Sequence, residues 1–261
     1  MRDVDETLQT LELWHNQYAS HYSQMNPARW LSLQQKIETC IVPLIEAGNS
    51  AAPFKILSLG SGSAAELYVL LKLRLEGKIK PFRYIGVEAN RAEHHELCLV
   101  YVDLAAQLAC TVGFYYQDAM LFQPEANSFD LVIFRHPLPA NYHEGTYGGV
   151  SCDYWPDNDW EDQQSVFTKM THKLSEWIKP DGHVFLSCYR DWEFERMHTL
   201  LSRISFPERI HYQDFSTTQD INRVDPFGSH YYQDGYFSVF KIDREKLSRR
   251  TSEVPERPQF I

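Results

Sequence analysis

Residues 56–67 read Ile56-Leu57-Ser58-Leu59-Gly60-Ser61-Gly62-Ser63-Ala64-Ala65-Glu66-Leu67. An apolar run comes first, small residues follow it, and a helix-like pattern begins after them. This order predicts a buried strand, a tight turn and a helix. Gly60 and Gly62 allow the backbone to turn sharply and to approach a ligand without a Cβ atom in the way. Because a Gly-x-Gly turn also occurs as a plain structural corner, the flanking segments must decide its role.

Outward from this turn, short apolar runs alternate with amphipathic stretches. Strands are expected at 54–59, 84–88, 111–116, 129–134 and 183–188, and helices at 66–76, 91–109, 160–178 and 192–202. Such alternation implies a mainly parallel sheet with helices on both faces. Two further strand-like runs, 210–215 and 236–242, have no clear helix between them. They predict an antiparallel pair at the sheet edge.

The two ends of the chain differ from this central part. Apolar residues recur at helical spacing through residues 5–48, so residues 1–50 are predicted to form a two-helix extension that covers a sheet edge or a pocket. Residues 51–242 are predicted to form the α/β domain. Residues 243–261 are charged, contain two prolines and are predicted to be a loosely held tail.

Acidic residues follow the second and third predicted strands. Glu88 ends one strand, and Asp118 and Ala119 come directly after the next. In open α/β sheets ligands bind beyond the carboxyl ends of the strands, where a carboxylate can accept hydrogen bonds from ribose hydroxyls. Taken singly, each acid also fits a solvated strand end or a helix N-cap. Together with the glycine turn, they predict a nucleotide-binding crevice.

In this order the motifs resemble those of the class I S-adenosylmethionine-dependent methyltransferases. Phe129-Asp130-Leu131-Val132-Ile133-Phe134 and the turn Lys179-Pro180-Asp181-Gly182 add to the resemblance, which covers residues 54–242. It implies a Rossmann-like seven-stranded, mostly parallel sheet with a terminal antiparallel strand, and S-adenosylmethionine as cofactor. By the same resemblance, Gly60 and Gly62 lie under the methionine part of the cofactor, Glu88 holds the ribose, and Asp118 with Ala119 meets the adenine.

The first motif departs from the family pattern at two positions. Ser58 stands where the family usually carries an acid that helps to hold the cofactor's amino group. Ala64 stands where a third glycine is common. Ser58 is still assigned to the cofactor site, and Glu66 is a candidate to compensate for the missing acid.

The methyl acceptor is expected to approach through residues 135–160, a long segment rich in aromatic residues and glycine. His136 directly follows the fourth strand and is the candidate general base, although a structural histidine fits the same position. The Asn-Pro-Pro-Tyr pattern of similar enzymes that act on base amines is absent. The net charge of −10 also opposes binding to nucleic acid. A small-molecule or protein acceptor is therefore predicted, and the oligomeric state is left open.

Three other function classes remain as alternatives. Residues 60–65 also fit the Gly-x-Gly-x-x-Ala fingerprint of dinucleotide-binding oxidoreductases, but Tyr68 and Lys72 follow the turn too closely to reach a nicotinamide ring. An aminopropyltransferase needs a carboxylate-lined slot, for which Asp153, Asp157 and Asp159 are partial candidates. A binding or scaffold protein that keeps the fold without turnover is the third alternative. No diagnostic metal-ligand spacing occurs, so no metal site is predicted.

The composition indicates whether the chain is ordered and in which compartment it is expected to work. An apolar fraction of 43% excludes wholesale disorder. The five cysteines are widely spaced, without a Cys-x-x-Cys pair, as expected for free thiols in a reducing compartment. The first residues show no apolar signal segment, and no stretch is long and apolar enough to span a bilayer. A soluble cytoplasmic protein without membrane attachment is expected.

Overall fold

A computed structural model of the chain describes residues 4–22, 33–48, 52–62, 64–88, 95–135, 170–188, 191–203, 205–212, 236–243 and 245–246. In chain order the elements are α1 (Val4–Tyr22), η1 (Ile37–Ile41), α3 (Val42–Ala47), β1 (Phe54–Leu59), α4 (Ala65–Leu75), β2 (Phe82–Glu88), α5 (His95–Gln107), β3 (Thr111–Tyr116), η2 (Ala119–Leu121), β4 (Phe129–Arg135), β5 (Ile178–Cys188), α7 (Asp191–Ser202), β6 (Ser205–Tyr212) and β7 (Tyr236–Ile242). Residues 33–36 and 170–177 are also helical.

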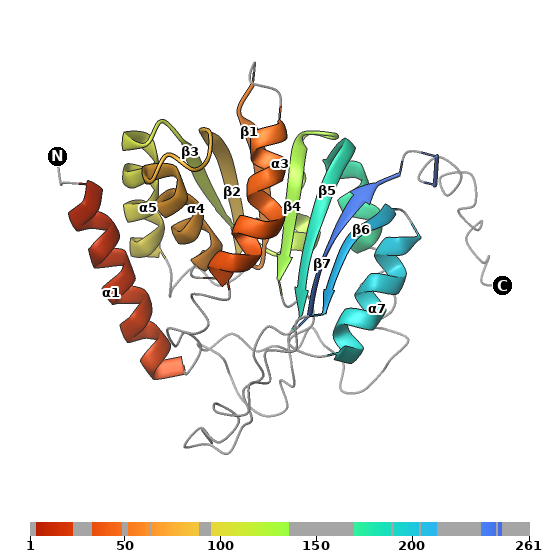
Figure 1. The fold of residues 1–261 in the computed structure, drawn as a ribbon, viewed down its shortest axis with the longest axis horizontal. Coiled ribbons are helices and arrows are strands. Elements are labelled where there is room, and N and C mark those ends of the chain that lie inside the picture. Colours follow the sequence, from red (N-terminus) through yellow and green to blue (C-terminus); the bar gives the residue numbers. More distant parts are fainter. Residues whose placement is uncertain are drawn as a thin grey trace.

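The strands join one sheet in the order β3-β2-β1-β4-β5-β7-β6 (Figure 1). β1 pairs in parallel with β2 and β4, while β2 pairs with β3, and β4 with β5, in the same sense. β7 runs antiparallel to both of its neighbours, β5 and β6. The predicted α/β sheet, mostly parallel with an antiparallel strand near its end, is confirmed.

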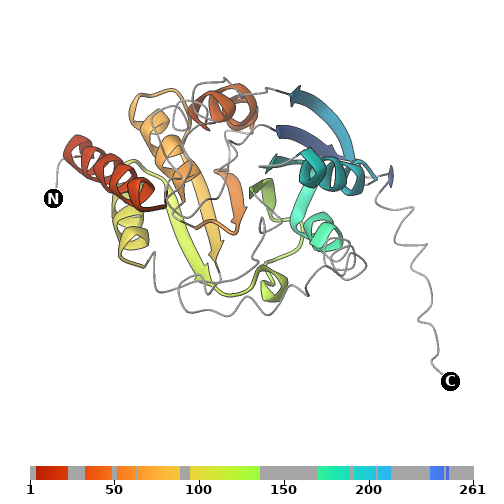
Figure 2. The same cartoon turned by 90° about the horizontal axis from the view of Figure 1, so that it is seen from below.

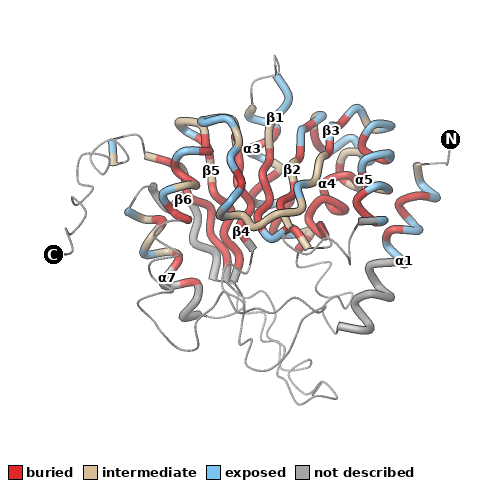
Figure 3. The backbone as a smooth tube through the Cα atoms, turned by 180° about the vertical axis from the view of Figure 1, so that it is seen from behind, coloured by how far each residue is buried: buried red, intermediate tan, exposed pale blue. Residues whose placement is uncertain are grey.

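The strands of the sheet are apolar on both faces because helices cover both faces. One core cluster joins the sheet to α4 and α5 and includes Ile56, Tyr84 and Leu104. The other joins the opposite face to helix 170–177 and α7 and includes Leu57 and Met197. Figure 2 shows α3 and α4 on one side of the sheet and α7 on the other. Figure 3 shows the buried residues concentrated in the strands and along α4, whose residues Ala65–Leu71 are all buried.

The Lys-Pro-Asp-Gly segment, predicted as a turn before the fifth strand, instead forms a bulge inside β5. Asp130 of β4 lies opposite residues 179–182 of β5, between two regular pairs of the ladder. Within the bulge, Asp181 has a φ of 66°. Extra residues on one strand bend it and interrupt the ladder locally. The four residues predicted to form a turn before the strand therefore lie within β5 instead.

Asp130 fastens this bulge to a third strand. One of its carboxylate oxygens lies 2.7 Å from the Nζ atom of Lys179. The other accepts a 2.8 Å hydrogen bond from the backbone amide of Lys55 at the start of β1. Asp130 thus connects β5 to the amino-terminal ends of β1 and β4.

The N-terminal extension packs on the helices that cover the sheet. Leu8 and Leu11 of α1 are buried in the same cluster as α4 and α5, and Ile37 and Ile41 of η1 join it. Tyr68 of α4 donates a 2.9 Å hydrogen bond to Glu12 of α1. The described part of α1 therefore forms an outer layer on α4 and α5 (Figure 1), whereas a sheet edge or a pocket was predicted as its partner.

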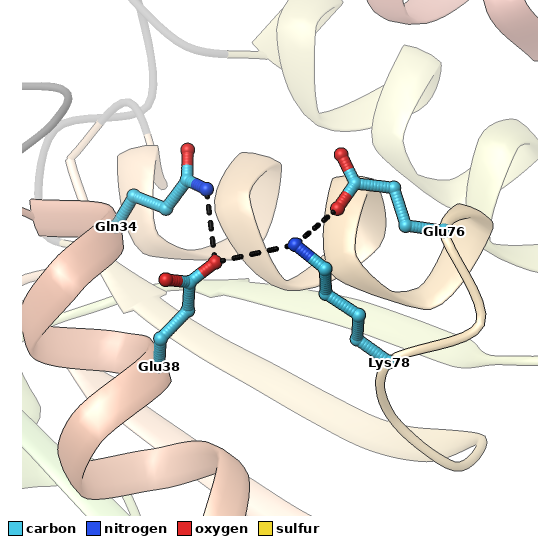
Figure 4. Close-up of polar contacts among 4 residues, drawn as sticks. All are labelled: Gln34, Glu38, Glu76 and Lys78. Carbon is cyan, nitrogen blue, oxygen red and sulfur yellow. Dashed lines mark hydrogen bonds and ion pairs between the residues drawn. The ribbon is translucent and has the colours of Figure 1, made fainter.

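A polar cluster on the surface joins this extension to the end of α4. Lys78 lies 2.9 Å from a carboxylate oxygen of Glu76 and 3.6 Å from one of Glu38, which also accepts a 2.9 Å hydrogen bond from Gln34 (Figure 4). The hydrogen bond with Glu76 and its charge raise the pKa of Lys78. Because solvent screens exposed ion pairs, these contacts contribute little to stability compared with the buried apolar residues beneath them.

Gly86, in the middle of β2, is required by close packing. A Cβ atom there would lie 2.7 Å and 2.8 Å from ring atoms of Phe114 and 2.9 Å from Oγ of Ser61, whereas a Cβ atom on Gly113 of β3 would meet nothing within 4 Å. We therefore expect Gly86→Ala to lower the free energy of unfolding by about 1–3 kcal/mol, as overpacking does. Gly113→Ala is the matched control and should change it much less. Urea unfolding of the two variants measures the difference, and equal stabilities would contradict the packing argument.

Candidate functional site

The turn after β1 uses a run of positive φ angles. Gly60, Gly62 and Ala64 have φ values of 62°, 50° and 51°. The backbone amide of Ser61 donates to the carbonyl of Val87 at 3.1 Å, which holds the turn against the end of β2. A Cβ atom on Gly60 or Gly62 would meet nothing within 4 Å, so both positions border open space. Only glycine adopts this backbone freely, and the space above it is available to a ligand.

Ala64 occupies a position that favours glycine. Its left-handed backbone starts α4, where it is the N-cap residue and no side chain caps the helix. For a residue with a Cβ atom this conformation costs roughly 1–2 kcal/mol. The third glycine that is common in similar sequences would remove that cost. At this position of the turn the backbone therefore favours glycine over alanine.

Glu88 is bonded directly to the glycine turn. Its Oε2 atom accepts a 2.8 Å hydrogen bond from the backbone amide of Gly62. A carboxylate has about four acceptor positions, so this bond leaves capacity for a ligand. Two of the predicted site residues, separated by a whole helix in the sequence, are therefore in contact.

Ser58 does not face the surface but bonds to a buried carboxylate. Ser58 and Glu66 are each 2% exposed, and the Ser58 hydroxyl donates to Oε1 of Glu66 at 2.6 Å. The hydroxyl of Tyr84 donates to the same oxygen at 2.8 Å. Burial, and secondly the charge of Glu66, raise the pKa of Tyr84, so that the phenol stays a donor at neutral pH. An acid thus lies beneath the turn, contributed by α4 rather than by β1.

Asp118 and Ala119 follow β3 at the same edge of the sheet. Tyr116, the last residue of β3, is the register partner of Glu88, which places Asp118 two positions beyond that pair. The carbonyl of Asp118 accepts a 2.9 Å hydrogen bond from Leu121, which closes the η2 turn. Asp118 and Ala119 are both half-buried. The carboxyl ends of β1, β2 and β3 therefore bring together the glycine turn, Glu88 and Asp118.

Solved structures share this arrangement of strands, although no family model and no curated protein matches the sequence. A protein of Listeria monocytogenes assigned to the class I S-adenosylmethionine-dependent methyltransferases is 14% identical, with a TM-score of 0.53 over 93% of this chain and 70% of its own. This chain has the Rossmann-like fold of the class I methyltransferases. A protein of Methanococcus maripaludis assigned to the S-adenosylmethionine-dependent methyltransferases is 12% identical, with a TM-score of 0.48 over 93% of this chain and 94% of its own.

Several predicted functional residues of this methyltransferase-like chain cannot be placed. His136, the candidate base, and Asp153, Asp157 and Asp159, the candidate polyamine ligands, lie outside the described residues. Tyr68, part of the dehydrogenase-like pair, is buried at 3% exposure and bonds to Glu12.

Tyr84 and Gly86 were not identified from the sequence, although both shape the candidate site. Tyr84 supplies a donor to Glu66, and Gly86 makes room for Ser61 behind the turn. A glycine inside a strand often marks a close approach, which was an available signal for Gly86. No local pattern indicates that the Tyr84 hydroxyl meets a carboxylate.

Three further observations on the described part of the chain concern metal binding, membrane-spanning helices and cysteines. Within it, no group of three His, Cys, Asp or Glu side chains could hold a metal ion. None of its helices combines the length and apolar character that a bilayer crossing needs. Cys40, Cys98 and Cys110 are buried and form no disulfide, and burial raises the pKa of Cys98 and Cys110. Raised pKa values keep the thiols of Cys98 and Cys110 protonated and poorly nucleophilic.

Proposed function

We propose that this protein binds S-adenosylmethionine and transfers its methyl group to a small-molecule or protein acceptor. The observation that carries the proposal is the 2.8 Å hydrogen bond between the amide of Gly62 and the carboxylate of Glu88. It joins the two elements that a Rossmann-like nucleotide site requires, a glycine turn and an acid beyond the second strand.

The residues present fit this cofactor. The open space above Gly60 and Gly62 suits the methionine part, Glu88 suits the ribose hydroxyls, and Asp118 suits the amino group of adenine. Ser58 is too deeply buried to meet the cofactor's amino group, and so is Glu66. We infer that Glu66 acts as a positioning residue, because its charge lies under the turn and is held by the Ser58 hydroxyl.

Bound S-adenosylmethionine supplies a methyl group on a positively charged sulfur. That methyl group would be open to in-line attack by a lone pair of the acceptor, and the electrons of the carbon–sulfur bond would stay on sulfur. For this in-line displacement the chain must mainly align the two molecules and exclude water. His136 is proposed to accept the acceptor's proton where one must be lost. A His136→Ala variant with full turnover would remove that role.

The acceptor and the cellular setting are proposed from composition. A net charge of −10 favours an acceptor other than nucleic acid, because binding to phosphates needs a basic surface. A cytoplasmic location without membrane attachment is proposed from the cysteine pattern and the absence of a long apolar segment in the sequence.

Calorimetric titration of the purified protein with S-adenosylmethionine and S-adenosylhomocysteine tests the proposal, with NAD as control. We expect both sulfur compounds to bind with dissociation constants on the order of micromolar, and NAD not to bind. Binding of NAD alone would replace the proposal with an oxidoreductase. Binding of neither sulfur compound would leave the fold without the proposed cofactor and would contradict the proposal.

A further inference from the structure

A cavity of about 430 Å³ lies on the sheet face that α4 and α5 do not cover. Two residues of its lining, Arg83 and Ile85, flank Tyr84 of β2, which belongs to the cluster under these helices. Because side chains alternate between the faces of a strand, the cavity lies on the other face. Parallel strands are usually joined by a helix that covers the sheet, but the described connection from β3 to β4 contains only the three-residue η2. This short connection leaves room for a small molecule on the face of β2 and β3.

The cavity extends along the strands and has two chemically different ends. Lys55 and Arg83, which both line it, are register partners in β1 and β2, so two cations lie at its amino-terminal end. Arg83 is also the register partner of Thr111 in β3. Tyr115, which lines the other end, lies four residues beyond Thr111 and therefore about 13 Å along the sheet. A ligand that contacts both ends must be elongated.

The amino-terminal end of the cavity is suited to an anion. Neither Lys55 nor Arg83 forms an ion pair with a described residue, and Asp130, which bonds to the backbone of Lys55, is paired with Lys179. Ser128, directly before β4, lines the same cavity, and its buried Oγ atom has no hydrogen-bond partner among the described residues. Buried polar atoms without a partner are rare, and a hydroxyl can donate to an anionic oxygen. Two cations and a free donor thus meet at this end.

The rest of the cavity presents apolar side chains to solvent. Tyr115 and Leu121 both line it and are 48% and 69% exposed. Phe122 packs behind them, with its ring centroid 5.2 Å from that of Tyr115. Ile85 lies on β2 between the level of the two cations and the level of Tyr115. A contiguous exposed apolar surface of this kind marks a ligand-binding groove, and an apolar chain laid along it would remove it from water.

We propose that this cavity binds an amphiphile with an unbranched apolar chain and an anionic head group. Lys55 and Arg83 bind the head group, because cations pair with its oxygens. The chain lies over Ile85 and extends to Tyr115 and Leu121. The head group is at the opposite end of β1 from the glycine turn, and only the end of the chain approaches that turn. The proposal does not rest on methyl transfer, but its test must distinguish this cavity from the proposed cofactor site.

The test is a calorimetric titration with octyl phosphate, without cofactor and below the concentration at which the probe forms micelles. We expect saturable binding, and an affinity that rises about two- to fourfold for each methylene added from butyl to octyl phosphate. The gain should stop once the chain is longer than the cavity, which extends about 13 Å along the sheet. Inorganic phosphate lacks the chain and 1-octanol lacks the charge, so each should bind about tenfold more weakly or worse.

Two pairs of variants locate the bound probe. Arg83→Gln should weaken octyl phosphate about fivefold or more, whereas Arg203→Gln, which removes the same charge from an exposed residue at the end of α7, should not. Leu121→Ser should weaken it about threefold or more, whereas Leu99→Ser, which changes a 55% exposed leucine of α5, should not. Glu125→Gln should tighten binding, since it removes a carboxylate from the cavity lining.

Three results would overturn the proposal. The first is no saturable binding of octyl phosphate. The second is equal weakening by the two members of either pair, which would indicate a general effect of charge or of apolar surface. The third is a Glu88→Ala variant that loses octyl phosphate as strongly as Arg83→Gln does, which would place the probe in the proposed cofactor site. Circular dichroism of each variant shows whether it is folded, so that a lost signal can be assigned to the cavity.

Discussion

Replacing Glu88 with alanine is expected to weaken S-adenosylmethionine binding by about 10- to 100-fold, because hydrogen bonds to a charged acceptor contribute roughly 1.5–3 kcal/mol. Glu88 holds the glycine turn through Gly62 and is proposed to accept hydrogen bonds from the ribose. Calorimetric titration of the variant measures the loss. Glu96→Ala, which removes an exposed carboxylate from α5, is the matched control and should bind as the unaltered protein does.

A second ligand separates the two roles of Glu88. We expect the 2′-deoxyribose analogue of S-adenosylhomocysteine to bind more weakly than the parent compound to the unaltered protein. If Glu88 contacts the ribose, the Glu88→Ala variant should bind the two compounds about equally. If Glu88 only holds the turn, both compounds should lose the same factor, and the ribose contact would be refuted.

Replacing Glu66 with leucine is expected to lower the free energy of unfolding by about 3 kcal/mol. The substitution leaves the buried hydroxyls of Ser58 and Tyr84 without their acceptor, and an unsatisfied buried donor costs roughly 1–3 kcal/mol. Urea unfolding followed by circular dichroism measures the change. Glu66→Gln keeps an acceptor oxygen and should lose clearly less.

The companion variant removes the donors as well as the acceptor. Replacing an entire buried hydrogen-bonded group by apolar residues of similar shape can be nearly neutral. The combination of Glu66→Leu, Ser58→Ala and Tyr84→Phe should therefore recover most of the lost stability. If this triple variant binds S-adenosylmethionine as tightly as the unaltered protein does, Glu66 has no positioning role. Failure to recover stability would show that the loss comes from packing rather than from unpaired hydroxyls.

The local sequence pattern was sufficient to predict most strands of the parallel sheet. β1 and β3 have the predicted bounds, because each is a short, mainly apolar or aromatic run between turn-forming residues. The strand predicted at 210–215 begins earlier, since β6 spans Ser205–Tyr212. Pro207 obscures the pattern there, and the register of β6 shifts between Pro207 and Arg209. A strand at a sheet edge accommodates proline at such an irregularity, so only the tertiary context reveals it.

Part of the candidate site could also be predicted from the sequence. The positions of Gly60, Glu88 and Asp118 follow from the rule that parallel strands present their carboxyl ends at one edge. The bond of Ser58 to Glu66 depends on how α4 is rotated against the sheet, which residue spacing does not specify. The bulge in β5 was missed because Lys-Pro-Asp-Gly has the composition of a turn, and only the pairing with Asp130 shows that the strand continues through it.

The position of β7 between β5 and β6 constrains the order in which the chain can be assembled during synthesis. β6 emerges from the ribosome before β7, yet its partner in the sheet is β7. Until residues 236–242 are available, β6 lacks that ladder and β5 presents an open edge. An unpaired strand edge is a template for pairing with other chains. The nascent protein is therefore most exposed to misassembly between the synthesis of β5 and that of β7, after the β3-β2-β1-β4 part of the sheet has formed.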